Sequence, residues 1–241
     1  MFKFDIDMKK IRVSILEMAE IMKNEWPFIK SKAINATAFQ CYKELKKEMM
    51  SGLDRPTPYT MSNLWVTQGD KANPVATLWY KGWADKYLRP LVKGGGRPQK
   101  RSEQQLQRSG AMGAYRYYTP GRNAPLNSYG NINPGSLVKI LSQTKSLWET
   151  KMNVSKKSKR RISAQSGYYF AIPRKKGNLM PGIYQKTSET TITRILMFVD
   201  NVVYRKILYF YEIVNKITKE NLEKNIQDAI KWCKLNPYLK K

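Results

Sequence analysis

The uneven placement of charge constrains this chain more than any other feature of its sequence. The stretch from Lys86 to Lys186 holds 21 basic residues and only two acidic ones, Glu103 and Glu149. Over all 241 residues, 44 Lys and Arg stand against 18 Asp and Glu, a formal charge of +26. Such a field repels itself and attracts polyanions. The middle of the chain must therefore fold with its cations in solvent or against an anionic partner: nucleic acid, an acidic protein surface or an anionic membrane.

Both ends of the chain show the apolar spacing of amphipathic helices. Residues 1–28 predict a short extended start and then a helix, which we expect Trp26-Pro27 to end because the residue before proline disfavours helical backbone angles. A second helix is predicted from Ile29 to Met50, with a stop at Ser51-Gly52. A closing helix is predicted from Thr218, as N-cap, to Lys234. The two apolar stripes are Ile34, Ala38, Cys41, Leu45 and Met49, and Leu222, Ile226, Ala229, Ile230 and Cys233.

The intervening segments predict strands and turns. Strands are expected at 64–66, 75–80, 168–172, 182–185, 191–198 and 204–210. Two prolines predict an extended loop over 53–60, and the basic run 151–166 predicts a loop ordered only by a partner. Short helices are expected at 102–109, capped by Ser102, and after Asn133-Pro134, with an inner face of Leu137, Ile140, Leu141 and Leu147.

This order of elements predicts an α+β fold. We expect an antiparallel sheet packed with the long helix of the N-terminal half and with the C-terminal helix, plus long irregular basic loops. We expect one structural domain over 1–241, with 1–28 as an N-terminal helical segment and 93–166 as a turn-rich basic insertion.

The chain lacks the residue types that most catalytic sites need. It has no histidine, so Ser-His-Asp and Cys-His sites are excluded. Cys41 and Cys233 are 192 residues apart and predict buried free thiols rather than a metal site. The glycines Gly94–Gly96 lack the ending of a phosphate-binding P-loop. We expect no enzyme, no cofactor and no metal; a nuclease whose distant carboxylates converge on a metal stays open as an alternative.

Three basic clusters are the candidate binding residues for nucleic acid or an acidic partner. Neutralising phosphates with lysine and arginine releases counterions and gives binding that does not depend on sequence. Tyr168, Tyr169 and Phe170, which lie between two of the clusters, could stack bases of a single strand. An acidic protein neighbour or plain solvation explains the same clusters equally well. The clusters are Arg97, Lys100 and Arg101; Lys156, Lys157, Lys159, Arg160 and Arg161; and Arg174, Lys175 and Lys176.

Several short segments, in their order along the chain, resemble a family of tailed-bacteriophage structural proteins. The resemblance is to minor tail or tail-completion proteins of the neck, and it covers roughly residues 30–235. Its match is at the level of short motifs, because this chain is unusually rich in lysine and asparagine. The segments are DRPTPYT at 54–60, GGRPQKR at 95–101, TPG at 119–121, YGNINPG at 129–135, ILS at 140–142 and PGIYQ at 181–185.

The resemblance implies a non-enzymatic virion protein at the head–tail junction. Its implied partners are portal, connector and tail proteins and further copies of the chain in a homo-oligomeric ring, with packaged DNA left open. No catalytic residues are carried over from the family. No apolar run approaches the roughly 20 residues that span a bilayer, so we expect no membrane partner. The N-terminus lacks an apolar signal-peptide core, so we expect synthesis in the host cytoplasm before assembly into the virion. The alternative without the resemblance is a sequence-independent nucleic-acid-binding protein.

Overall fold

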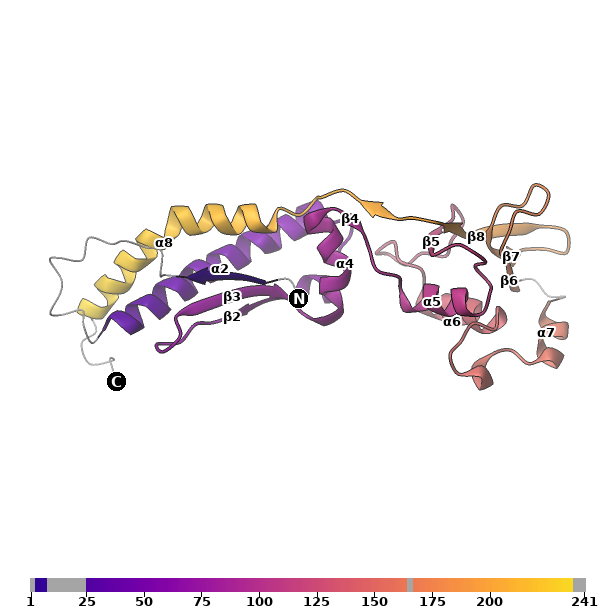
Figure 1. Cartoon of the computed structure of the whole chain (residues 1–241), viewed down its shortest axis with the longest axis horizontal. Helices are drawn as coiled ribbons and strands as arrows, with labels where there is room; N and C mark the ends of the chain where they lie inside the picture. Colours follow the sequence, from indigo (N-terminus) through magenta and orange to yellow (C-terminus); the bar gives the residue numbers. More distant parts are fainter. Residues whose placement is uncertain (1–2, 8–24, 164–166, 236–241) are drawn as a thin grey trace. The chain divides into compact units, whose positions relative to one another are not determined.

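The long helix α2 (Trp26–Gly52) builds the first half of the molecule around one apolar stripe. The computed structural model describes residues 3–7, 25–163 and 167–235 (Figure 1). The predicted stripe residues Ile34, Cys41 and Leu45 are all buried. Proline in the first turn favours the start of the helix, because backbone N–H groups in the first turn have no partner within the helix and the missing N–H of proline costs nothing there. Trp26-Pro27 therefore begins this helix; the expected helix before it lies outside the described residues.

Helix α8 (Phe210–Leu235) packs along α2. It begins eight residues earlier than predicted. The strand expected over 204–210 is wrong except at Tyr204, which belongs to β9 (Val203–Tyr204). Phe210 and Val214 extend the stripe of Leu222 at spacings of four, and both are fully buried. Packing of that longer stripe explains the helix, and Thr218 is an interior residue rather than an N-cap.

A buried polar contact fixes how α2 and α8 meet. The Asn225 side-chain amide donates to Thr37 Oγ1 at 2.8 Å and to Gln40 Oε1 at 2.9 Å. Thr37 Oγ1 in turn donates to the Ala33 carbonyl. Because an unpaired buried amide is costly, sliding one helix past the other would be penalised at this point.

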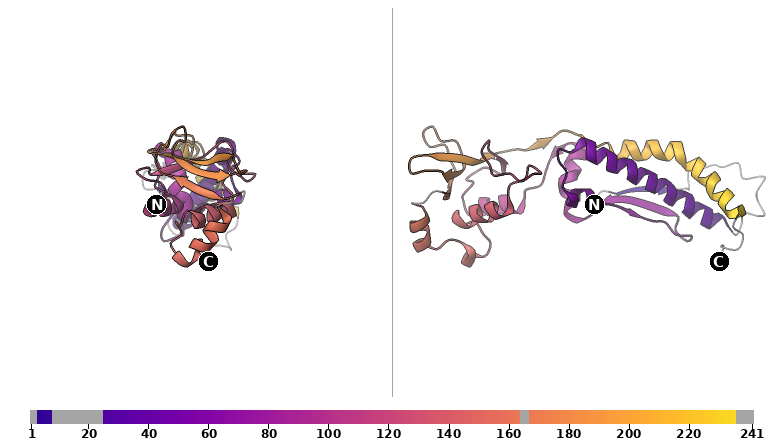
Figure 2. Two further views of the ribbon diagram at one scale, coloured as in Figure 1. Left: turned by 90° about the vertical axis from the view of Figure 1, so that its right-hand side faces the viewer. Right: turned by 180° about the vertical axis from the view of Figure 1, so that it is seen from behind.

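A three-stranded antiparallel sheet covers another side of α2 (Figure 2). Its order is β1 (Lys3–Asp7), β3 (Val75–Tyr80), β2 (Leu64–Thr67). Strands β2 and β3 confirm the pair predicted at 64–66 and 75–80. Tyr80 packs on Phe210 with ring centroids 5.5 Å apart, so sheet and helices share one core. Both cysteines are buried and free, as predicted. Burial raises the pKa of the Cys41 thiol to about 11.

Two helices in this region were not predicted. Helix α3 (Pro58–Ser62) replaces the expected extended loop, because Pro58 occupies a first-turn position and Thr57 Oγ1 caps the Thr60 N–H at 3.1 Å. Helix α4 (Gly82–Lys93) buries Ala84, Leu88 and Val92 at spacings of four.

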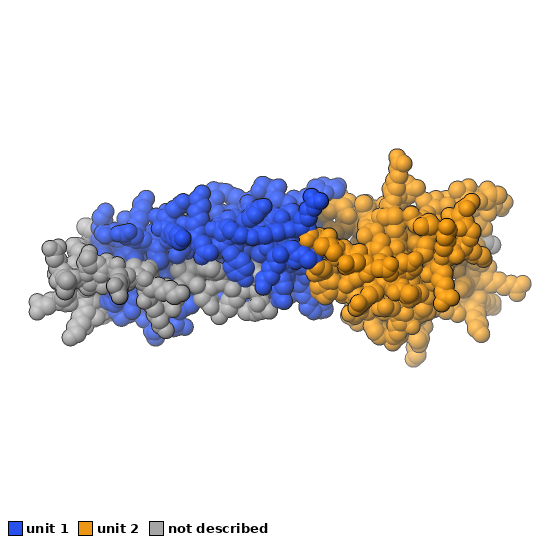
Figure 3. All heavy atoms as spheres, turned by 45° about the horizontal axis from the view of Figure 1, so that its top comes forward, with its two compact units in different colours: residues 1–95, 205–241 blue, residues 96–204 orange. Residues whose placement is uncertain are grey.

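The chain divides into two compact units, coloured in Figure 3. Unit 1 is residues 1–95 with 205–241, and unit 2 is residues 96–204. Strands β4 (Gly95–Gly96) and β9 pair where the chain enters and leaves unit 2. We expected one domain with an insertion over 93–166. The second unit starts close to that boundary but runs on to Tyr204 and has its own core.

Unit 2 is a four-stranded antiparallel sheet with short helices. The sheet order is β5 (Tyr117–Pro120), β8 (Ile192–Val199), β7 (Gly182–Lys186), β6 (Tyr169–Ile172). The helical elements are α5 (Arg101–Arg108), α6 (Pro134–Gln143), the 3₁₀ turn η2 (Thr150–Met152) and α7 (Lys156–Ile162). Asn133 caps α6 as predicted, whereas Lys100 rather than Ser102 precedes α5. The molecule is thus α+β with antiparallel sheets, as the sequence predicts.

Two glycines allow backbones to approach closely inside unit 2. A side chain at Gly182 would strike the Leu196 carbonyl oxygen of the neighbouring strand β8. A Cβ at Gly121 would lie 2.5 Å from the Arg194 carbonyl oxygen of the same strand. Both positions therefore require glycine for steric reasons.

We expect Gly182→Ala to destabilise unit 2 by at least about 2 kcal/mol, since the obstacle is backbone that cannot rotate away. Urea unfolding followed by circular dichroism would measure this loss. The matched control is Gly135→Ala, whose new Cβ would lie 3.4 Å from Asn133 Oδ1 inside a helix and should be nearly neutral. Equal stability of the two variants would contradict the close approach of β7 and β8.

Candidate polyanion interface in the second unit

Unit 2 holds more than half of the excess positive charge of the chain. Residues 96–204 contain 19 basic and four acidic residues. Of the four acids, Glu103 is fully buried, and the other three are exposed. The surface of unit 2 therefore keeps the strong positive excess of its composition.

The densest basic cluster forms the helix α7, not the predicted loop. Ser155 caps the helix: its Oγ accepts from the Ser158 N–H at 3.1 Å. This serine cap is the local signal that a charge-based interpretation overlooks. Residues 164–166, the end of the predicted loop, lie outside the described residues. All five cations of the cluster are exposed: Lys156, Lys157, Lys159, Arg160 and Arg161.

These five cations repel one another. Lys156 and Arg160, and Lys157 and Arg161, are four residues apart and so are neighbours on the helix surface, where like charges destabilise. Within the described part of the chain, no carboxylate lies at ion-pairing distance from any of the five. The helix thus exposes positive charge that no carboxylate among the described residues neutralises.

The second cluster lies in the turn that follows β6. Arg174, Lys175 and Lys176 are all exposed. Lys176 and Leu179 exchange backbone hydrogen bonds at 3.0 Å in each direction, which close the turn. The turn thus holds three adjacent cations in solvent.

The third cluster is different, because one of its members is structural. Arg97 is 7% exposed and forms a two-point ion pair with the fully buried Glu103, at 2.7 and 2.5 Å. Glu103 also accepts from the backbone N–H groups of Lys100 at 2.6 Å and Tyr118 at 3.1 Å. Hydrogen bonding to Glu103 raises the pKa of Arg97. The expectation that Arg97 is an open binding residue is therefore wrong: its guanidinium is buried, and both terminal nitrogens are already paired with Glu103.

The two neighbours of this ion pair remain at the surface. Arg101 is exposed on the first turn of α5. Lys100 is also exposed in part, but its ammonium lies 5.6 Å from the Tyr118 ring. Desolvation, and then the charge of Arg97, lower the pKa of Lys100. Arg101 is consequently the member of this cluster best able to meet a polyanion.

The aromatic residues beside the clusters pack inside unit 2. Tyr168 and Tyr169 are buried. Phe170 stacks against Tyr168 at 6.1 Å and against Tyr184 at 6.0 Å between centroids. These rings are engaged with each other, so the expectation that they stack nucleic-acid bases loses its basis.

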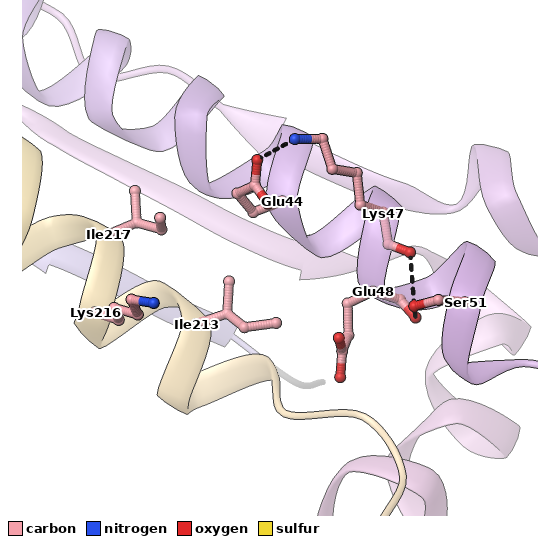
Figure 4. A pocket seen from close by; sticks show the side chains of 7 residues that line it. All are labelled: Glu44, Lys47, Glu48, Ser51, Ile213, Lys216 and Ile217. Carbon is pink, nitrogen blue, oxygen red and sulfur yellow. Dashed lines mark hydrogen bonds and ion pairs between the residues drawn. The ribbon is translucent and has the colours of Figure 1, made fainter.

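A pocket of about 250 Å³ lies in unit 1, between α2 and α8 (Figure 4). Its lining consists of Glu44, Lys47, Glu48, Ser51, Ile213, Lys216 and Ile217. Glu44 and Lys47 pair at 2.5 Å on an exposed face. Because acids and lysines alternate around it, the pocket offers no strong net charge to a ligand.

Across residues 3–7, 25–163 and 167–235, no three His, Cys, Asp or Glu side chains gather as a metal site would require. None of the helices in that part of the chain is long and apolar enough to cross a bilayer.

Glu103 is the important residue that the sequence analysis missed. Its signal was its position three residues after Lys100, where a glutamate can accept from the N-cap backbone N–H. Its pairing with Arg97 could not be read from the sequence, because nothing there says which of the 19 cations of unit 2 turns inward.

We expect Glu103→Gln to destabilise unit 2 by about 3 kcal/mol, because Arg97 would keep its buried charge and lose its counter-ion. Urea unfolding would measure the change. Glu149→Gln removes the same charge from an exposed position of the same unit and should change stability by less than about 0.5 kcal/mol. If both variants unfold alike, the ion pair does not stabilise the fold.

The comparisons with known proteins add no family to this description. No protein-family model, curated protein or solved structure matches the chain.

Proposed function

We propose that this chain is a non-enzymatic structural protein of a tailed-phage virion, acting at the head–tail junction. It would bind portal, connector or tail proteins and further copies of itself in a ring. The support begins with the sequence, in which six short segments resemble neck proteins in the order expected along the chain.

The observation that carries the proposal is where those segments lie in the fold. The segment 95–101 supplies Arg97 of the buried ion pair. The segments 119–121 and 181–185 supply the two glycines that approach β8. The segment 129–135 supplies the Asn133 cap of α6. Four of the six segments thus supply residues that shape unit 2, as expected if the likeness reflects a shared architecture rather than chance matches in surface loops.

Exposed aromatic residues in unit 1 give a second line of support. Tyr59, Trp83 and Tyr87 are 55%, 67% and 38% exposed. Tyr87 OH lies 3.0 Å from Thr60 Oγ1, which ties α4 to α3, and Trp83 is one helical turn before Tyr87. Large exposed aromatics that gather in one place are typical of protein–protein contacts. A ring of copies would bury such a surface.

Mass spectrometry of particles purified from the phage that encodes this chain tests the proposal. We expect the protein to be present in a fixed number of copies per particle, because a ring is closed by symmetry. The particles should be washed in 1 M salt, where the screening length falls to about 3 Å, so that an adsorbed basic protein is removed. Absence from the washed particles would overturn the proposal.

A further inference from the structure

We infer that helix α7 binds the sugar–phosphate backbone of double-stranded nucleic acid without reading its sequence. The inference deepens the proposed function by naming a ligand for one surface. It rests on the geometry of α7 and can be tested on the isolated chain, so it can fail or succeed separately from the assignment to a virion.

The first argument is the spread of charge around the helix. Residues of an α-helix follow one another at about 100°, so the five cations of α7 cover about 200° of its circumference. Ser158 and Ile162 fill the remaining side and are half-buried. Figure 1 and Figure 2 show α7 at the margin of unit 2. A helix with cations on its front and both flanks suits a groove bordered by phosphates on two strands.

The second argument separates nucleic acid from an acidic protein. Every exposed residue of α7 is Lys or Arg. Protein–protein interfaces are depleted of lysine and have an apolar or aromatic centre, whereas protein–DNA interfaces are polar and strongly positive. With no apolar anchor on its exposed side, α7 matches the second kind of interface.

The third argument separates double strands from single strands. Proteins that bind single strands combine a basic groove with aromatic rings that stack on successive bases. The nearest aromatic residues in sequence, Tyr168 and Tyr169, are buried, and Phe170 lies between Tyr168 and Tyr184. Helix α7 itself carries charge and no aromatic residue, which favours the backbone of a duplex.

Fluorescence anisotropy with a labelled DNA duplex of arbitrary sequence, measured from 50 to 200 mM salt, tests the inference. The test variant replaces Lys156, Lys157, Lys159, Arg160 and Arg161 with Gln. The control variant removes the same charge from exposed positions of unit 1, by replacing Lys43, Lys216, Lys219, Lys224 and Lys231 with Gln. Comparing the two separates a local binding site from the general effect of net charge.

We expect the α7 variant to bind at least about tenfold more weakly, and its plot of log affinity against log salt to be shallower by about 4.5, as five lost phosphate contacts would give. The control variant should change affinity by less than about threefold. Changing the duplex sequence should have no effect. Circular dichroism and urea unfolding should show no loss of fold or stability, because the replaced side chains are exposed and their mutual repulsion is removed.

Three results would overturn the inference. Equal weakening by the two variants would mean that only the total charge matters. Tighter binding of a single strand than of the duplex would mean that bases are contacted. Competition by polyglutamate as effective as that by duplex at equal charge would indicate an acidic protein as the partner. If the variant with five substitutions does not fold, the comparison is repeated with double variants. The test variant is then Lys156→Gln with Arg160→Gln, and the control is Lys216→Gln with Lys219→Gln.

Discussion

The architecture of unit 2 depends on one buried carboxylate in a region crowded with cations. Glu103 accepts both arms of the Arg97 guanidinium and the N–H groups of Lys100 and Tyr118. It thereby joins the entering chain, the start of α5 and strand β5 at one point. Burying an arginine is expensive unless its charge is balanced and its donors are satisfied. In a unit with 19 basic residues, this single acid determines which cation is structural and leaves the others to the surface.

Several elements whose cause is local were predicted from the sequence, although the local caps of α3 and α7 were overlooked. The stripe of α2, the cap of α6 by Asn133, and the pair β2 and β3 all follow from spacing or from one residue type in the right place. Elements that depend on residues far away in the sequence, or whose own composition disfavours them, were not predicted. Helix α8 begins early because Phe210 finds a core to fill, and α7 forms although its own charges oppose it. The fold class emerged correctly because it depends on the order of elements more than on their ends.

The candidate site shows the same division. The sequence located the three basic clusters, because runs of Lys and Arg are visible in the sequence itself. It could not separate a buried arginine from an exposed one: Arg97 and Arg101 are four residues apart, yet only Arg97 turns inward. It also suggested base stacking by aromatics that pack against one another instead. Burial, which is a property of the whole fold, decides between these roles.

The insertion of unit 2 into unit 1 has a consequence for how the chain emerges from the ribosome. Helix α2 is complete at Gly52, but its partner α8 starts only at Phe210. At ordinary translation rates of about 5–20 residues per second, the part of the apolar face of α2 that packs against α8 waits on the order of ten seconds for that helix. Unit 2 is synthesised entirely within that interval and can finish folding first. During that interval the α8-facing side of α2 is available to chaperones.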